Sequence, residues 1–119
     1  ILVEIDQKYN KEGLPTIVVG DMNAQPDKAF HKTMCNHYED TFLVAEKRCG
    51  TIGTFNGSKG GDENLSLSKR RIDHIYIHST DKGHLTAKEY TVNRDKHKIN
   101  GDLHYPSDHN PVVVDMTLK

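Results

Sequence analysis

Thr16-Ile17-Val18-Val19-Gly20-Asp21-Met22-Asn23 is the stretch that decides the fold of this chain. Its first four residues form a short β-branched run, which predicts a strand buried on both faces. Gly20 and Asp21 follow directly at the carboxyl end of that strand. Because open α/β sheets bind their ligands beyond the carboxyl ends of strands, Asp21 and Asn23 are candidate functional residues. The stretch therefore predicts an α/β fold with a site at this strand end.

Two further polar motifs adjoin strand-like runs. Arg71-Ile72-Asp73-His74 leads into Ile75-Tyr76-Ile77, and Ser107-Asp108-His109-Asn110-Pro111 precedes a last strand predicted from Val112 to Leu118. Strand alternation places Asp73 on the face of Ile75 and Ile77, where a carboxylate is costly unless it has a partner. Carboxylates, an amide and an imidazole can hold a metal ion, orient a water molecule and stabilise a phosphoryl group. Together the motifs predict half of a phosphohydrolase active site.

The rest of the chain alternates between helical and strand-like patterns. Ile1, Ile5 and Tyr9 recur at helical spacing, and Gly13 and Pro15 end that predicted helix. A second helix is predicted after Pro26, and a further strand from Leu85 to Val92. The segment from Asp40 to Ala45 is ambiguous in its secondary structure. A long surface loop is predicted from Gly50 to Arg70, and a polar, mobile connection from Asn93 to Tyr105.

Length and charge narrow the classes of function. The chain has 119 residues, the size of one small domain, and a formal net charge of -1. Long-range attraction of the kind that non-specific nucleic-acid binders use is therefore absent, and a phosphate substrate has to be held locally. No run approaches the roughly 18 apolar residues of a membrane span. Cys35 and Cys49 fix no redox compartment, so the localisation stays open.

Each motif taken alone has a simpler interpretation. Gly-Asp after a strand is commonly a turn in which Asp bonds its own backbone, and the Ser-Asp-His-Asn-Pro motif also suits a turn. Asp73 alone is most often a strand residue in a salt bridge, here with Arg70 or Arg71. The remaining histidines of polar segments are interpreted as solvated: His31, His37, His78, His84, His97 and His104. The joint occurrence of the motifs beside successive strands favours the functional interpretation.

On these residues, and on Gly53-Thr54-Phe55-Asn56-Gly57 between them, the chain resembles the C-terminal half of the endonuclease/exonuclease/phosphatase superfamily. The resemblance covers residues 1–119 and implies half of a four-layered α/β sandwich, with one mixed sheet and flanking helices. It implies a metal-dependent phosphoric ester hydrolase. The reaction that it implies is in-line attack of water on a phosphoester, by a phosphodiesterase, nuclease or phosphatase.

The resemblance also implies a role for each matched residue. Asp21 orients the attacking water, Asn23 contacts the scissile phosphate, and His109 donates to the phosphoryl oxygens. Asp73 fixes the tautomer of that imidazole. Asp108 serves the site of a Mg ion, with Mn as a possible replacement. One departure is His74, where an aromatic residue is commoner; it could alter the packing behind the site or add a second imidazole.

The resemblance leaves the substrate open between a small phosphoester and a short single-stranded nucleic acid. Phe55 and Asn56 are expected near it, with Phe55 able to stack on a base. The N-terminal half of the family domain is absent, so the expected partner is that half or a second copy, and the isolated chain is expected to be inactive. Two alternatives remain: an inactive fragment or scaffold that keeps the fold, and an acid-base hydrolase without a metal.

Overall fold

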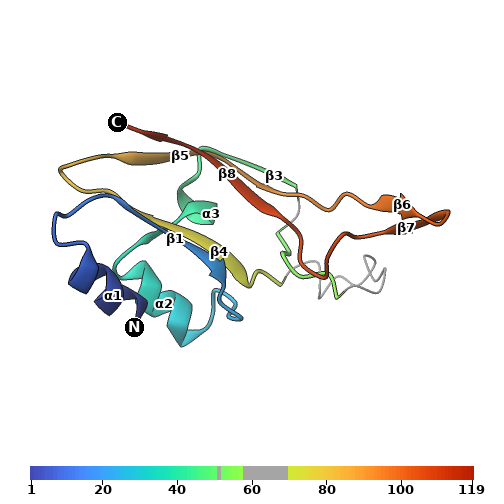
Figure 1. Cartoon of the computed structure of the whole chain (residues 1–119), viewed down its shortest axis with the longest axis horizontal. Coiled ribbons are helices and arrows are strands. Elements are labelled where there is room, and N and C mark those ends of the chain that lie inside the picture. The colour runs from blue at the N-terminus through green and yellow to red at the C-terminus, as the bar shows by residue number, and fades with distance from the viewer. Residues whose placement is uncertain (51, 58–69) are drawn as a thin grey trace.

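The computed structural model describes residues 1–50, 52–57 and 70–119, and Figure 1 shows how the elements are arranged. Most of the loop predicted between Gly50 and Arg70 lies outside the described residues. In the described part the fold is mixed α/β, with strands in three separate sheets. The expectation of one mixed sheet is therefore wrong for the described residues.

The first sheet carries two of the polar motifs. Its order is β1-β4-β2, formed by Thr16–Asp21, Asp73–His78 and Glu39–Asp40, and both pairings are antiparallel. The register pairs Thr16 with His78 at one end of β1 and Asp21 with Asp73 at the other. Residues that are cross-strand partners have neighbouring side chains, so this register brings the first two motifs together.

The last strand of the second sheet follows the third motif directly. Its order is β3-β5-β8, formed by Lys47–Gly50, Leu85–Val92 and Val112–Leu118. β3 runs parallel to β5, and β8 runs antiparallel to β5, with Val92 opposite Val112. The motif at residues 107–111 therefore leads directly into β8.

The segment predicted as a polar connection contains regular structure. β6 and β7, His97–Ile99 and Asp102–His104, pair as an antiparallel hairpin that extends away from the helices in Figure 1. Its turn contains Asn100 and Gly101, both with positive φ, +52° and +87°. Asn and Gly tolerate positive φ, which a two-residue hairpin turn requires at both positions. The Asn-Gly pair is therefore a hairpin signal that the prediction from sequence did not use.

The helices are α1, Leu2–Tyr9, α2, Ala29–Cys35, and the short α3, Thr41–Val44. Asp40 begins α3, because its Oδ1 accepts a hydrogen bond of 3.0 Å from the Phe42 amide, as an N-cap residue does. This cap resolves the ambiguous segment from Asp40 to Ala45. Among the described residues no helix is long and apolar enough to cross a membrane.

Helices α1 and α2 lie on one side of the first sheet, and α3 and the second sheet lie on the other (Figure 1). On the helix side, Met34, Tyr38 and Tyr76 form a buried cluster. On the other side, Ile77 of β4 joins a larger cluster whose members lie mainly on β5: Leu85, Ala87, Tyr90 and Val92, with Ala45. Strand β4 therefore contributes to both cores and holds the layers together.

Strand β1 is not buried on both faces, in contrast to the prediction. Val18 packs on the helix side, whereas Ile17 is 50% exposed and Val19 is 62% exposed. These two side chains alternate with Val18 and share the opposite face. The β-branched run is thus a half-covered strand within the described part of the chain.

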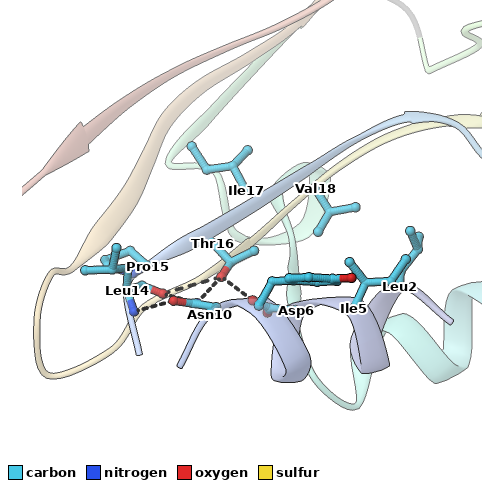
Figure 2. A pocket seen from close by; sticks show the side chains of 10 residues that line it. Leu2, Ile5, Asp6, Asn10, Leu14, Pro15, Thr16, Ile17 and Val18 are labelled. Atoms are coloured by element: carbon cyan, nitrogen blue, oxygen red, sulfur yellow. Dashed lines mark hydrogen bonds between the residues drawn. The ribbon is translucent and has the colours of Figure 1, made fainter. Parts of the chain in front are cut away.

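A groove separates α1 from the start of β1 (Figure 2). Hydrogen bonds at its floor join the two elements: Thr16 Oγ1 donates to Asp6 Oδ1 at 3.1 Å, and the Leu14 amide donates to Asn10 Oδ1 at 2.9 Å. Ile5, Leu14 and Ile17 line it and are about half exposed. The apolar side chains that line the groove therefore extend the exposed apolar surface of β1.

A buried ion pair lies beneath β4. Arg71 Nη2 is 2.9 Å from Asp40 Oδ2, and Arg71 Nη1 donates to Asp40 Oδ1 at 3.2 Å. Arg71 therefore pairs with Asp40, and not with Asp73 as one alternative proposed. His31, interpreted as a surface residue, is 5% exposed and also contacts Asp40, so that interpretation is wrong.

Replacement of Asp40 by alanine is expected to lower the free energy of unfolding by about 3–5 kcal/mol, because it leaves the Arg71 charge buried without its partner. Urea unfolding measures this difference. The matched control is Glu46→Ala, which breaks the exposed pair with Lys88 (3.1 Å) and is expected to cost at most about 1 kcal/mol. Equal losses in the two variants would contradict the assignment.

Candidate active site

His109 lies among the carboxylates of all three motifs. Its Nδ1 is 2.8 Å from Asp73 Oδ2 and 3.0 Å from Asp73 Oδ1. Its Nε2 is 3.6 Å from Asp21 Oδ2 and 4.0 Å from Asp108 Oδ1. The His109 and Asp73 side chains are 29% and 21% exposed, so the group is open to solvent but partly shielded.

The carboxylates change the protonation of His109. The hydrogen bond with Asp73 raises the pKa of His109 above its ordinary value of 6.5, and the charges of Asp73, Asp21 and Asp108 act in the same direction, against a smaller effect of burial. Because a carboxylate accepts, Nδ1 is the protonated nitrogen that faces Asp73. Nε2 is left to face Asp21 and the open side, where it can give or take a proton.

The first motif forms a turn as well as part of this group. Asp21 Oδ1 accepts a hydrogen bond of 2.8 Å from the Asn23 amide, and Asn23 has a φ of +48°. Asn adopts this left-handed conformation more readily than most residues. One Asp21 oxygen thus fixes the turn, while the other faces His109. The turn and the functional interpretation of Gly-Asp are both consistent with this geometry.

Thr54 connects the second motif to the third. Its buried hydroxyl accepts hydrogen bonds from the Ile72 and Asp73 amides, at 3.0 and 3.1 Å. Its carbonyl accepts from the Asn110 amide at 2.7 Å. The strand that carries Asp73 and the turn that carries His109 are therefore held by a single residue.

Asn56 completes this attachment from the interior. It is 1% exposed, its backbone amide donates to the Asp108 carbonyl at 2.8 Å, and its side-chain amide donates to Ser107 O and Asn110 Oδ1, at 2.9 and 2.8 Å. The side-chain amide predicted for substrate contact thus points into the protein. The structuring roles of Thr54 and Asn110 were missed, although both residues lie within the quoted motifs.

Phe55 lies on the open side of the same segment. Its ring meets the His109 ring edge to face, with centroids 5.4 Å apart. The Arg70 guanidinium lies 4.8 Å from the Phe55 ring centroid. Arg70, offered by the sequence as a partner for Asp73, thus lies on the ring that contacts His109, a contact that no sequence pattern indicates.

The donor set of this group fits a hard cation. Ligand atoms of Asp21, Asp73 and His109 all lie within 4.8 Å of one another. Asp108, predicted to serve the metal, contributes a further carboxylate beside His109. Oxygen-rich groups of this type suit Mg, which favours carboxylates and retains bound water.

Acidic groups and an imidazole gathered at strand ends of an α/β fold are typical of hydrolases that activate water. The sequence matches the Endonuclease/Exonuclease/phosphatase family over residues 1–109, and the chain belongs to this family. Membership implies a protein of the phosphoesterase kind. The resemblance stated from the motifs is thereby confirmed.

Several solved structures share this fold. A mannosyl-6-phosphatase from Bacteroides thetaiotaomicron VPI-5482 is 26% identical with a TM-score of 0.78, and the alignment covers 98% of this chain and 42% of that one. A family protein from the same species is 28% identical with a TM-score of 0.76 and the same coverage. One from Bacteroides vulgatus is 20% identical with a TM-score of 0.75, over 99% of this chain and 41% of that one, and shows the fold alone. A search among curated proteins gave no match.

This chain therefore spans about two-fifths of the length of these structures, 42% in the first case. The described residues correspond to part of the family fold.

The pKa of His109 is expected to fall when Asp73 is replaced by asparagine, because the bond to Asp73 is the largest cause of the increase. NMR titration of the imidazole without added metal measures it. Since a raised pKa favours the charged form in the folded state, the associated stability is present below about pH 6.5 and is lost as the pH rises through the folded pKa.

Glu46→Gln is the matched control, because it removes a carboxylate that pairs with Lys88 on another part of the surface. It is expected to leave the His109 titration unchanged. A His109 titration that is the same in Asp73→Asn and in the parent protein would contradict the geometry described above.

Proposed function

We propose that this chain supplies half of the active site of a Mg-dependent hydrolase that cleaves a phosphoester by in-line attack of water. The observation that carries the proposal is the imidazole of His109, held by Asp73 on one side and facing Asp21 on the other. The chain is the C-terminal half of a four-layered α/β sandwich in this proposal. Both phosphodiesters, including nucleic acids, and phosphomonoesters remain within the class.

Each residue of the site has a separate role in the proposed reaction. Asp21 accepts a hydrogen bond from the attacking water and orients it, since its Oδ2 is on the exposed side of the group. His109 donates from Nε2 to a phosphoryl oxygen as negative charge develops there. Asp73 holds Nδ1–H and stabilises the imidazolium, as a carboxylate does for a catalytic histidine. Asn23 contacts the scissile phosphate from the end of its turn.

Charge supports a metal-dependent reaction. Asp21, Asp73 and Asp108 surround a single imidazole, so a phosphate anion that enters meets an excess of negative charge. Asp108 and Asp21 are the residues that would hold Mg, or Mn in its place. When bound, the ion would polarise the phosphoryl group and stabilise the leaving oxygen. A site of this composition is therefore suited to an anionic substrate only with a cation present.

Phe55 is proposed to define the substrate side of the site. It is partly exposed, lies against His109 and carries Arg70 on its ring, so it can contact a base or a sugar ring while Arg70 approaches the phosphate. The Bacteroides mannosyl-6-phosphatase supports inclusion of sugar phosphates among the test substrates. Asn56 supports this surface from below through its bonds to Ser107 and Asn110.

The exposed face of β1 is proposed to bind the remaining part of the family domain, with a second copy of the chain as the alternative partner. Ile17 and Val19 are 50% and 62% exposed there. Apolar strand faces of this kind are normally covered. Activity is therefore to be measured in a polypeptide that also carries the rest of the domain.

In that polypeptide, His109→Ala is expected to lower kcat by about 10²–10⁴-fold, the usual contribution of a positioned acid or base, with a much smaller change in KM. Steady-state hydrolysis of a phosphoester panel measures both constants. His84→Ala is the control, since His84 is exposed and its backbone pairs with Lys119 at the far end of β5. An unchanged kcat in His109→Ala would exclude this assignment.

Removal of divalent cations is expected to abolish turnover, and added Mg is expected to restore it. Hydrolysis assayed after chelation, and again after titration with Mg or Mn, tests this. Turnover that persists after chelation would support an acid-base hydrolase without a metal. No turnover of any phosphoester with Mg present would support a scaffold that keeps the fold.

A further inference from the structure

Strand β4 presents opposite faces to the site and to the interior. Asp73 faces His109, whereas the next residue, His74, is 1% exposed and lies on the face of the fully buried Tyr76. The rings of His74 and Tyr76 are stacked, with centroids 5.5 Å apart. His74 therefore lies behind the candidate site and does not contribute a second imidazole to it.

The partners of His74 define a single tautomer. Its Nε2 is 2.6 Å from the carbonyl oxygen of Ala24, which can only accept, so Nε2 carries the proton. Its Nδ1 is 3.2 Å from Arg71 Nη1, which can only donate, so Nδ1 is unprotonated. His74 is thus neutral and joins Arg71 to the turn that follows β1. Burial lowers its pKa, which is consistent with this form.

Arg71 is itself fixed. Both Asp40 oxygens contact its guanidinium, and His31 Nε2 lies 3.3 Å from Asp40 Oδ2. His31 Nδ1 is 2.8 Å from the Tyr76 hydroxyl. His74 therefore belongs to a rigid buried network with one end on α2.

The same network argues against a second metal site. Ligand atoms of His31, Asp40 and His74 lie within 4.8 Å of one another, as a metal centre requires. The Arg71 guanidinium, however, already contacts both Asp40 and His74 and supplies the positive charge. The network is consequently structural.

The other end of the network is the turn that carries Asn23. Three bonds hold this turn: the Met22 amide donates to Ile72 O at 2.9 Å, the Asn23 amide to Asp21 Oδ1 at 2.8 Å, and His74 to Ala24 O. Asn23 has a φ of +48°, a left-handed conformation that Asn tolerates and that these bonds stabilise. Ala24 is buried, so loss of the His74 bond would leave its carbonyl without that donor and favour rearrangement of the turn.

We propose that His74 is a positioning residue that sets the orientation of Asn23 toward the phosphate, through its hydrogen bond to the Ala24 carbonyl. The proposal rests on the proposed phosphoesterase function. It predicts that the effect of His74 on turnover is transmitted through Asn23, and not through Asp73, its neighbour on β4. A displaced Asn23 lowers turnover because a small misplacement of a contact group reduces the rate strongly.

Two variants that differ by one methylene test this in the whole domain. In His74→Gln the amide nitrogen can occupy the position of Nε2 and reach Ala24. In His74→Asn the amide lies near the position of Nδ1 and falls short. We expect kcat of His74→Gln within about threefold of the parent and kcat of His74→Asn lower by about tenfold or more.

Each variant is also combined with Asn23→Ala. In that background His74→Asn is expected to add less than a threefold loss, because the group that it positions is already absent. The amide NMR signal of Asn23 is expected to shift in His74→Asn and to stay in place in His74→Gln, which gives a readout independent of turnover.

Two outcomes would overturn the proposal: equal kcat values in His74→Asn and His74→Gln, or a full additional loss from His74→Asn in the Asn23→Ala background. If His74→Asn does not fold, a kcat of His74→Gln as low as that of Asn23→Ala, or an Asn23 amide signal displaced in His74→Gln, overturns it. Failure of the proposed function is separate, since it would appear as an unchanged kcat in His109→Ala, a variant that none of the His74 and Asn23 comparisons uses.

Discussion

The antiparallel register of β1 with β4 is the constraint on which the rest of the site depends, because it makes two aspartates direct cross-strand partners. Like charges in such positions repel, so the pairing of Asp21 with Asp73 is unfavourable unless a hydrogen-bond donor lies beside them. His109 occupies that position and bonds Asp73. The turn at residues 107–110 must therefore be held in place, and Thr54 and Asn56 hold it through bonds to the turn backbone. The repulsion between the two aspartates and the backbone hydrogen bonds of the turn therefore both bear on the position of the His109 imidazole.

Strand alternation then couples this site to the core. A slip of one residue would turn Asp73 into the interior and bring His74 into the site. The buried network opposes such a slip, since Arg71 and His74 have specific partners in Asp40 and Ala24. Buried polar groups of this kind favour one arrangement because every alternative leaves a donor or a charge without a partner. The buried network on the His74 face of β4 therefore helps to define the geometry of the candidate site on the Asp73 face.

Sequence patterns predicted the elements that local chemistry determines. The strands from Leu85 and from Val112, the helix near the start of the chain and the polar groups at strand ends all follow from periodicity and composition. The burial of His31 could not be predicted, because its partner Tyr76 is distant in sequence and only the tertiary fold brings His31 against Tyr76 and Asp40. Division into separate sheets also depends on pairing between distant strands. Asn56 was assigned to the substrate because the pattern shows that an amide is present but not which way it points.

The open apolar face of the described residues and the composition of the site both call for groups beyond those described. Ile17 and Val19 lie on β1, the strand that ends at Asp21, so whatever covers this apolar face also approaches the candidate site. The site itself has three carboxylates around one imidazole, and Arg70 lies on the ring of Phe55, which contacts that imidazole. An anionic substrate requires more positive charge than these groups provide. In the proposed function, the remaining part of the family domain covers the apolar face and a bound cation balances the charge.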